Sequence, residues 1–215
     1  FELTQAQENS LNEILIDMAS PYHMNRLLQG DVGSGKTVVA GLAMYAAISA
    51  GKQAALMVPT EILAEQHKES LENLFPDLPV ALLTGGLKAA EKREVLEEIA
   101  SGQAQLIVGT HALIQEGVHY QDLGLVIIDE QHRFGVDQRL ALRNKGANHT
   151  TPHQLVMTAT PIPRTLAMSA YGDLDTSVID ELPPGRTPIQ TVTIPLDRRE
   201  EVLQRIASNC TEGKQ

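Results

Sequence analysis

The chain has 215 residues, enough for one domain with a sizeable core and the beginning of a second. It carries 17 Lys and Arg against 27 Asp and Glu, and the resulting net charge of -10 argues against attraction of its whole surface to nucleic acid or anionic membranes. No apolar run approaches the roughly 20 residues that a membrane-spanning helix needs. The single cysteine, Cys210, excludes an internal disulfide and is typical of a reducing, cytosol-like compartment.

Apolar runs that suit buried parallel strands alternate along the chain with segments of helical spacing. A helix is expected around residues 11–18, and further helices with apolar stripes around 39–50 and 95–99. The expected strands are 26–29, 54–58, 80–84, 106–108, 125–128 and 154–157. This alternation predicts an α/β fold whose mostly parallel sheet is covered by helices on both faces, with ligands bound at the carboxyl ends of the strands.

The pattern weakens after residue 172. Acidic residues without a basic neighbour lead into Pro183-Pro184-Gly185, which predicts a linker over 173–188. A strand over 189–194 and a helix around 202–206 would then open a second domain, or form its stub, over 189–215. Because the chain begins at Phe1 and ends soon after this helix, we expect it to be a piece of a larger protein, with some catalytic groups outside it.

Residues 30–37 read GDVGSGKT and fit the P-loop pattern G-x-x-x-x-G-K-[ST], between a short strand and an amphipathic helix. Glycines let the backbone N–H groups turn toward phosphate oxygens, and the start of the helix adds its positive dipole end. Lys36 is expected to reach the β- and γ-phosphates, and Thr37 to bind Mg²⁺. The expected nucleotide-binding residues are Gly30, Asp31, Val32, Gly33, Ser34, Gly35, Lys36 and Thr37.

Two carboxylates follow the apolar strand 125–128. Asp129 is placed to bind Mg²⁺ through water, and Glu130 to orient and polarise an attacking water. A kinase that transfers phosphate to a small molecule does not need the second carboxylate, so the pair favours hydrolysis.

Other signals are less specific. Thr4 to Gln7 form a T-x-x-Q capping box, which is the better local interpretation of Gln7, although its amide could also pair with adenine.

Three strand ends carry small hydroxyl residues. Each of them could cap a helix, or together they could offer a track to a chain of phosphates. Thr158 and Thr160 could sense a γ-phosphate. The seven histidines form no convincing metal set, since Pro152 separates His149 from His153.

Six segments occur in the order that is typical of a superfamily 2 helicase motor: LTQAQ, GDVGSGKT, PTEILAEQH, GTHALIQ, DEQHRFGV and TATPIPRT. Over nearly its whole length the chain resembles the first RecA-like motor domain of the RecG family, the bacterial ATP-dependent helicases of branched DNA. Transcription-repair coupling translocases are similar through RFGV and PIPRT but tend to carry a second Glu where this chain has Gln131, which favours the RecG family.

The resemblance implies a RecA-like P-loop fold over 1–172, with ATP and Mg²⁺ as cofactors and Gln7 contacting adenine. It implies that the nucleotide state is coupled to DNA by Gln131, His132, Thr158 and Thr160. It also implies DNA contacts at Thr60, Glu61, Gly85, Gly109 and Thr110. The expected partners are branched double-stranded DNA, namely forks and Holliday junctions, and the second motor and wedge domains of the same parent. The expected setting is recombination and repair in the bacterial cytoplasm, on the nucleoid and not on a membrane.

Two other functions stay open on the sequence. The chain could be an ATP-gated module that clamps DNA or a partner without separating strands, or, less in keeping with Glu130, a small-molecule kinase. An absent arginine finger can be worth about 10³- to 10⁵-fold in rate, so the chain alone is expected to hydrolyse ATP poorly. Its acidity predicts that it binds DNA weakly by itself.

Overall fold

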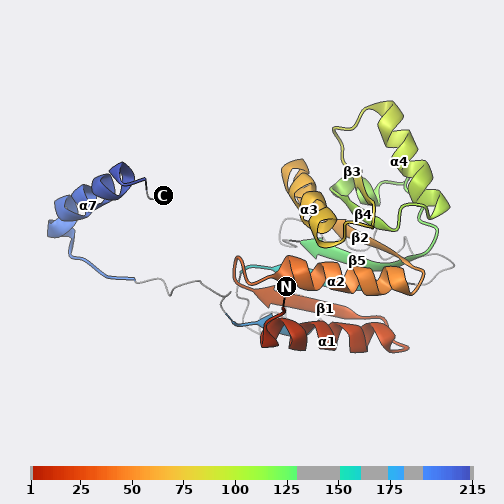
Figure 1. The fold of residues 1–215 in the computed structure, drawn as a ribbon, viewed down its shortest axis with the longest axis horizontal. Helices are drawn as coiled ribbons and strands as arrows, with labels where there is room; N and C mark the ends of the chain where they lie inside the picture. Colours follow the sequence, from red (N-terminus) through yellow and green to blue (C-terminus); the bar gives the residue numbers. More distant parts are fainter. Residues whose placement is uncertain (1, 130–150, 161–173, 182–190, 214–215) are drawn as a thin grey trace. The chain divides into compact units, whose positions relative to one another are not determined.

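A parallel seven-stranded sheet lies at the centre of the first unit of the structure (Figure 1). The computed structural model describes residues 2–129, 151–160, 174–181 and 191–213, in two compact units that divide between Pro183 and Pro184. The strands are β1 (Asn25–Gly30), β2 (Gln53–Met57), β3 (Val80–Leu83), β4 (Leu106–Gly109), β5 (Leu123–Asp129), β6 (His153–Thr158) and β7 (Asp175–Ile179). They are arranged in the order β3-β4-β2-β5-β6-β1-β7, and every pair is parallel. The α/β fold expected from the sequence is confirmed.

Helices connect these strands. Among the described residues of the first unit they are α1 (Gln5–Ala19), α2 (Lys36–Ser49), α3 (Glu61–Leu74), α4 (Ala89–Ser101) and the 3₁₀ turn η1 (His111–Ile114). Thr4 caps α1, and Thr60 caps α3 by accepting a hydrogen bond from the backbone N–H of Leu63 at 3.3 Å. These caps satisfy N–H groups that a helix leaves without partners in its first turn.

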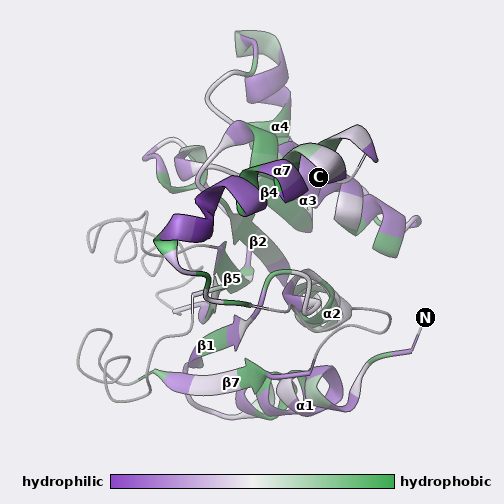
Figure 2. Cartoon of the chain, turned by 90° about the vertical axis from the view of Figure 1, so that its left-hand side faces the viewer, coloured by the Kyte–Doolittle hydropathy of each residue, from purple (hydrophilic) through white to green (hydrophobic). Residues whose placement is uncertain are grey.

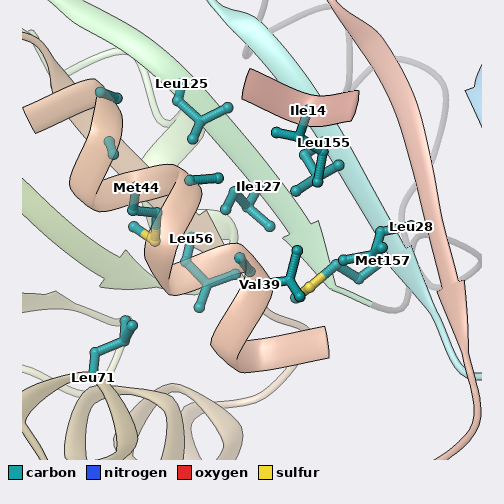
Figure 3. Close-up of a cluster of buried hydrophobic side chains, with 14 of the residues drawn as sticks. Ile14, Leu28, Val39, Met44, Leu56, Leu71, Leu125, Ile127, Leu155 and Met157 are labelled. Carbon is teal, nitrogen blue, oxygen red and sulfur yellow. The ribbon is translucent and has the colours of Figure 1, made fainter. Parts of the chain in front are cut away.

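The core lies on both faces of the sheet. Alternate residues of one strand point to opposite faces, so Leu125 and Ile127 of β5 join one hydrophobic cluster while Val126 and Ile128 join another. The first cluster packs under α1, α2 and α3, and Figure 3 shows its side chains meeting between the sheet and these helices. The second packs against α4 and η1. Burial on both faces explains why these strands read as continuous apolar runs.

Part of the segment predicted to be a linker is strand β7 of the sheet. Residues 175–179 pair with β1, from Arg26 beside Asp175 to Gly30 beside Ile179, so the linker predicted over 173–188 is wrong for these residues. As an edge strand, β7 needs only one buried face, and only Ser177 and Ile179 are buried. Its partner lies about 150 residues earlier in the chain, so local composition could not reveal the pairing.

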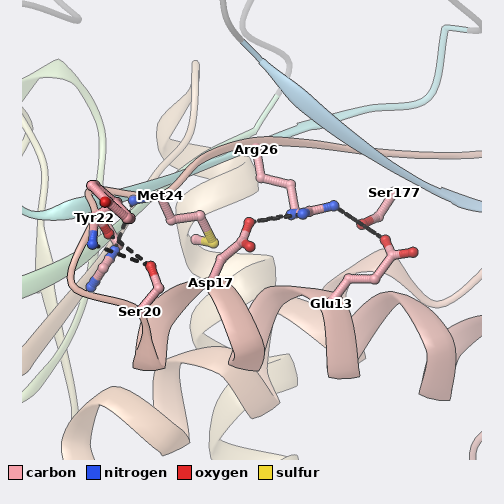
Figure 4. A network of polar contacts seen from close by, with 8 residues as sticks. Glu13, Asp17, Ser20, Tyr22, Met24, Arg26 and Ser177 are labelled. Carbon is pink, nitrogen blue, oxygen red and sulfur yellow. Dashed lines mark hydrogen bonds and ion pairs between the residues drawn. The ribbon is translucent and has the colours of Figure 1, made fainter.

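An ion-pair network joins α1, β1 and β7. The guanidinium of buried Arg26 donates from Nε to Asp17 Oδ2 at 2.8 Å, and from one terminal nitrogen to Glu13 Oε2 at 3.2 Å and to Ser177 Oγ at 2.9 Å. Figure 4 shows both carboxylates reaching from α1 toward the guanidinium. The network fixes α1 against β1 and the edge strand β7.

The second unit contains η4 (Leu196–Arg198) and α7 (Arg199–Thr211). The helix expected around 202–206 is confirmed, whereas the strand expected over 189–194 is wrong for residues 191–194, which take no regular structure. α7 has no buried residue, and Figure 2 shows it as largely hydrophilic.

Candidate functional site

The segment between β1 and α2 is a wound loop that begins at Gly30 and gives way to helix at Lys36. Gly33 and Gly35 have φ values of 81° and 88°, in the left-handed region that favours glycine. Gly35 is the N-cap of α2 and has no side chain to cap the backbone N–H groups of the first turn. These groups and the positive end of the helix dipole form a site for anionic oxygens.

The loop's polar side chains fit a nucleotide phosphate. Lys36 Nζ donates to the carbonyl oxygens of Gly30 at 2.6 Å and Asp31 at 2.9 Å, which keeps the ammonium at the loop. Ser34 Oγ is buried and has no hydrogen-bond partner in the described part of the chain. A glycine-wound cradle, an ammonium and a buried hydroxyl are donors that suit phosphate, and Thr37 adds a half-buried hydroxyl in the first turn of α2.

The sheet order brings the second motif beside this loop. β6 lies between β1 and β5, with Thr158 in register with Gln29 of β1 and Met157 in register with Asp129 of β5. Two strand spacings place the P-loop strand and the Asp129 strand about 10 Å apart. A metal-bound triphosphate can span that distance, so the residues present fit Mg²⁺ and ATP.

The middle strand ends at one of the expected coupling residues, Thr158, and Thr160 follows it. Thr158 is buried at the end of β6, and its Oγ1 accepts the backbone N–H of Thr160 at 3.1 Å. Thr160 is exposed on the same turn. The residues Glu130, Gln131 and His132 lie outside the described residues, and their expected roles stay predictions.

Gln7 takes part in two contacts at once. Its side-chain Oε1 accepts the backbone N–H of Thr4 at 3.0 Å, and its backbone N–H donates to Thr4 Oγ1 at 3.4 Å, so the capping box is present. Its Nε2 also donates to the carbonyl oxygen of Ser34 in the P-loop at 2.9 Å. A Cβ added at Gly35 would lie 2.3 Å from that nitrogen, so the amide lies directly against the loop. The cap and a position at the nucleotide site are compatible.

The hydroxyl-bearing strand ends also come together. β3, β4 and β2 are neighbours in the sheet, so the segments after them share one edge. We call these segments the phosphate track, composed of Thr60, Glu61, Gly85, Gly109 and Thr110. Thr110 Oγ1 is buried without a hydrogen-bond partner among the described residues, and a Cβ at Gly109 would lie 2.2 Å from the Leu83 carbonyl oxygen.

Several track residues are engaged within the protein. The backbone N–H of Thr110 donates to the Leu83 carbonyl oxygen at 3.2 Å. Thr60 is the N-cap of α3, so the cap interpretation is confirmed for it. Glu61 Oε1 accepts the backbone N–H of Gly86 at 2.7 Å. Because a carboxylate only accepts hydrogen bonds and is repelled by phosphate, a contact from Glu61 to DNA would have to use its backbone.

Sequence reasoning missed two residues at this edge. His67 of α3 lies with Nε2 3.2 Å from Asp129 Oδ2, and it belongs to the PTEILAEQH segment, where no role was given to it. Glu181 accepts the backbone N–H of Ala6 at 3.2 Å and lines a cavity of about 360 Å³ beside Gly30 and Asp31. No local signal marked Glu181, since it lay in the predicted linker.

Other sites are less developed. Within the described ranges, no three His, Cys, Asp or Glu side chains gather as a metal site. His153 accepts the backbone N–H of Met24 through Nδ1 at 3.0 Å and stacks on His23. No helix in the described part of the chain is long and apolar enough to cross a membrane.

Comparison with known proteins gives relatives that are longer than this chain. The ATP-dependent DNA helicase RecG of Streptococcus pneumoniae is 68% identical over 215 residues, covering 100% of this chain and 32% of that protein. RecG of Escherichia coli strain K12 is 59% identical over 219 residues, with the same two shares covered. The chain therefore spans about a third of the length of the curated relatives it matches.

Solved structures match as well. A structure of RecG bound to a three-way DNA junction matches with a TM-score of 0.86 and 49% identity, over 99% of this chain and 28% of that one. The Hef helicase domain of Pyrococcus furiosus shares the fold, with a TM-score of 0.59 and 24% identity over 80% of this chain and 38% of that one. The DEAD/DEAH box helicase family model matches residues 4–169, and the chain belongs to this family.

Proposed function

We propose that the chain is the ATP-binding motor domain of an ATP-dependent helicase that acts on branched DNA. The observation that carries this proposal is that the carboxyl ends of the strands form two neighbouring groups. The ends of β1, β6 and β5 bring together the P-loop, Thr158 and Asp129, while the neighbouring ends of β2, β4 and β3 form the phosphate track. A motor needs a nucleotide site and a nucleic-acid site on one rigid element, and the carboxyl ends of these strands would provide both.

In the proposed reaction water attacks the γ-phosphate of ATP, and the bond to the β-phosphate oxygen breaks. The P-loop N–H groups and Lys36 bind the phosphates. Thr37 and Asp129 would hold Mg²⁺, which supplies positive charge to the phosphate oxygens when it is bound. Glu130, directly after Asp129, would orient the attacking water and accept its proton. Gln7 would contact adenine beside the loop.

The phosphate track would contact the DNA backbone through hydroxyls and backbone N–H groups, which need no basic surface. This is compatible with the net charge of -10. Branched DNA is proposed as substrate because the relatives that match the whole chain at 56–68% identity are RecG helicases, and one solved RecG is bound to a three-way junction. The second motor and wedge domains would be supplied by the rest of a full-length protein acting on the bacterial nucleoid.

The test is ATP hydrolysis by the full-length protein with and without fork DNA. We expect fork DNA to stimulate hydrolysis in the wild type, and both Lys36→Ala and Glu130→Gln to abolish hydrolysis and branch migration. Lys52→Ala is a matched control, since Lys52 pairs with Asp122 at the opposite edge of the sheet. Wild-type turnover in Glu130→Gln would refute the role given to that carboxylate.

A triplex-displacement assay separates a motor from a static clamp. ATP-dependent displacement by the full-length protein supports translocation. Hydrolysis that is stimulated by DNA without displacement would instead identify an ATP-gated clamp, as in a module that grips DNA without separating strands.

A further inference from the structure

His67 is a buried polar residue on an otherwise apolar face of α3. The buried residues of this helix are Ala64, His67 and Leu71, which recur at the spacing of one helix face. Only about a tenth of the His67 side chain is exposed, and its Nε2 lies 3.2 Å from Oδ2 of Asp129, whose side chain is 15% exposed. The two residues are 62 positions apart in the chain.

The chemistry of this pair determines which side chain donates the hydrogen bond. An ionised carboxylate only accepts hydrogen bonds, so Nε2 of His67 carries the hydrogen and donates it to Asp129. The other ring nitrogen, Nδ1, is buried and has no partner among the described residues. A buried polar atom without a partner costs about 1–3 kcal/mol, a cost that an apolar side chain at this position would avoid. Packing alone therefore does not account for histidine here.

We propose that His67 is a positioning residue for the hydrolysis site, which holds the Asp129 carboxylate in the orientation that binds Mg²⁺. The contact restrains Oδ2 and leaves the second oxygen, Oδ1, for the metal or its water. This inference rests on the proposed function, in which Asp129 is the metal-binding carboxylate. Hydrogen-bonding partners of metal-binding side chains typically change metal affinity or activity by about 10- to 100-fold when they are removed.

The same contact links the metal site to the phosphate track. Glu61 begins α3 six residues before His67, or about 9 Å along the helix axis. Asp129 is thus hydrogen-bonded to the helix whose first turn lies on the track. Leu71, one turn further along the same face, is buried in the core and provides a control for loss of stability alone.

The test compares His67→Leu with His67→Gln in the full-length protein. The Nε2 of Gln is the same number of bonds from Cα as the Nε2 of His, so Gln can restore the donated hydrogen bond, whereas Leu cannot. Mn²⁺ binding in the presence of a slowly hydrolysed ATP analogue is measured by electron paramagnetic resonance, together with the Mg²⁺ dependence of ATP hydrolysis. We expect His67→Leu to weaken Mn²⁺ binding by about 10-fold or more, and His67→Gln to lie nearer to wild type. Leu71→Ala should lower thermal stability without weakening Mn²⁺ binding.

Three results would overturn the inference. They are wild-type Mn²⁺ affinity in His67→Leu, an equal loss in His67→Leu and His67→Gln, and an equal loss in Leu71→Ala. If the wild type itself hydrolyses ATP with Mg²⁺ while His67→Leu is unchanged, the inference fails and the proposed function stands. If the wild type neither binds metal-nucleotide nor hydrolyses it, both fail.

Discussion

Replacing Gln7 by Glu separates the two contacts made by its side-chain amide. A glutamate keeps an oxygen that can accept the Thr4 N–H, now 3.0 Å from Gln7 Oε1, so the capping box survives. It loses the N–H that Gln7 Nε2 donates to the Ser34 carbonyl oxygen at 2.9 Å. It also places a negative charge against the loop that is proposed to bind phosphate.

The expected magnitudes differ for folding and for binding. A carboxylate in the first turn of a helix gains about 0.3–1 kcal/mol from the dipole, while the lost hydrogen bond costs about 0.5–1.5 kcal/mol. The free energy of unfolding should therefore change by between a gain of about 0.5 kcal/mol and a loss of about 1.2 kcal/mol. For ATP, the lost bond to the loop and the new repulsion act in the same direction. Together they should reach about 1.4 kcal/mol, or tenfold weaker binding.

Isothermal titration calorimetry with a slowly hydrolysed ATP analogue measures the affinity, and thermal unfolding measures stability. Two controls isolate the effect. Gln5→Glu adds the same charge at an exposed position two residues away, and it should leave the affinity near wild type. Thr4→Ala removes the cap, so it should cost about 1 kcal/mol of stability without weakening ATP binding. Unchanged affinity in Gln7→Glu would refute the assignment of Gln7 to the nucleotide site.

Asp17→Asn should lower the free energy of unfolding by about 1.5–3 kcal/mol in urea, because a buried Arg26 loses a charged acceptor at 2.8 Å; a loss below about 0.5 kcal/mol would contradict this. Gly109→Ala should lower the free energy of unfolding by about 1–3 kcal/mol in the same measurement, since the new Cβ would lie 2.2 Å from the Leu83 carbonyl oxygen. Unchanged stability would contradict the expected clash with β3. Burial lowers the pKa of His153, against a smaller opposing effect of the Asp17 carboxylate, so the unfolded chain takes up its proton at higher pH than the folded chain. The contribution of His153 to stability is therefore complete above about pH 6.5 and is lost as the pH falls below it. The difference in free energy of unfolding between wild type and His153→Asn should shrink between pH 7.5 and 5.5. A constant difference would contradict this pKa direction.

The strongest predictions from sequence were those whose signal lies within a few neighbouring residues. The P-loop is one contiguous segment, and its glycines, Lys36 and helix start can be recognised together because the loop folds on itself. The six expected strands were found because both their faces are buried, which gives continuous apolar runs. β7 was missed since an edge strand with one buried face gives a short signal.

The sequence by itself determined the chemistry at single strand ends, namely a phosphate loop, the Asp129 carboxylate and a set of hydroxyls. It left open whether Gln7 capped a helix or reached a nucleotide, and it gave no role to His67. Only the tertiary structure placed Gln7 against the P-loop and His67 against Asp129, because the Gln7–Ser34 and His67–Asp129 contacts join residues 27 and 62 positions apart. Such contacts depend on the order of strands in the sheet, which is set by packing of the whole core and not by local propensity. The net charge of -10 likewise described the whole chain, and it could not show that the sheet order brings the hydroxyl residues after β2 and β4 to one end of neighbouring strands.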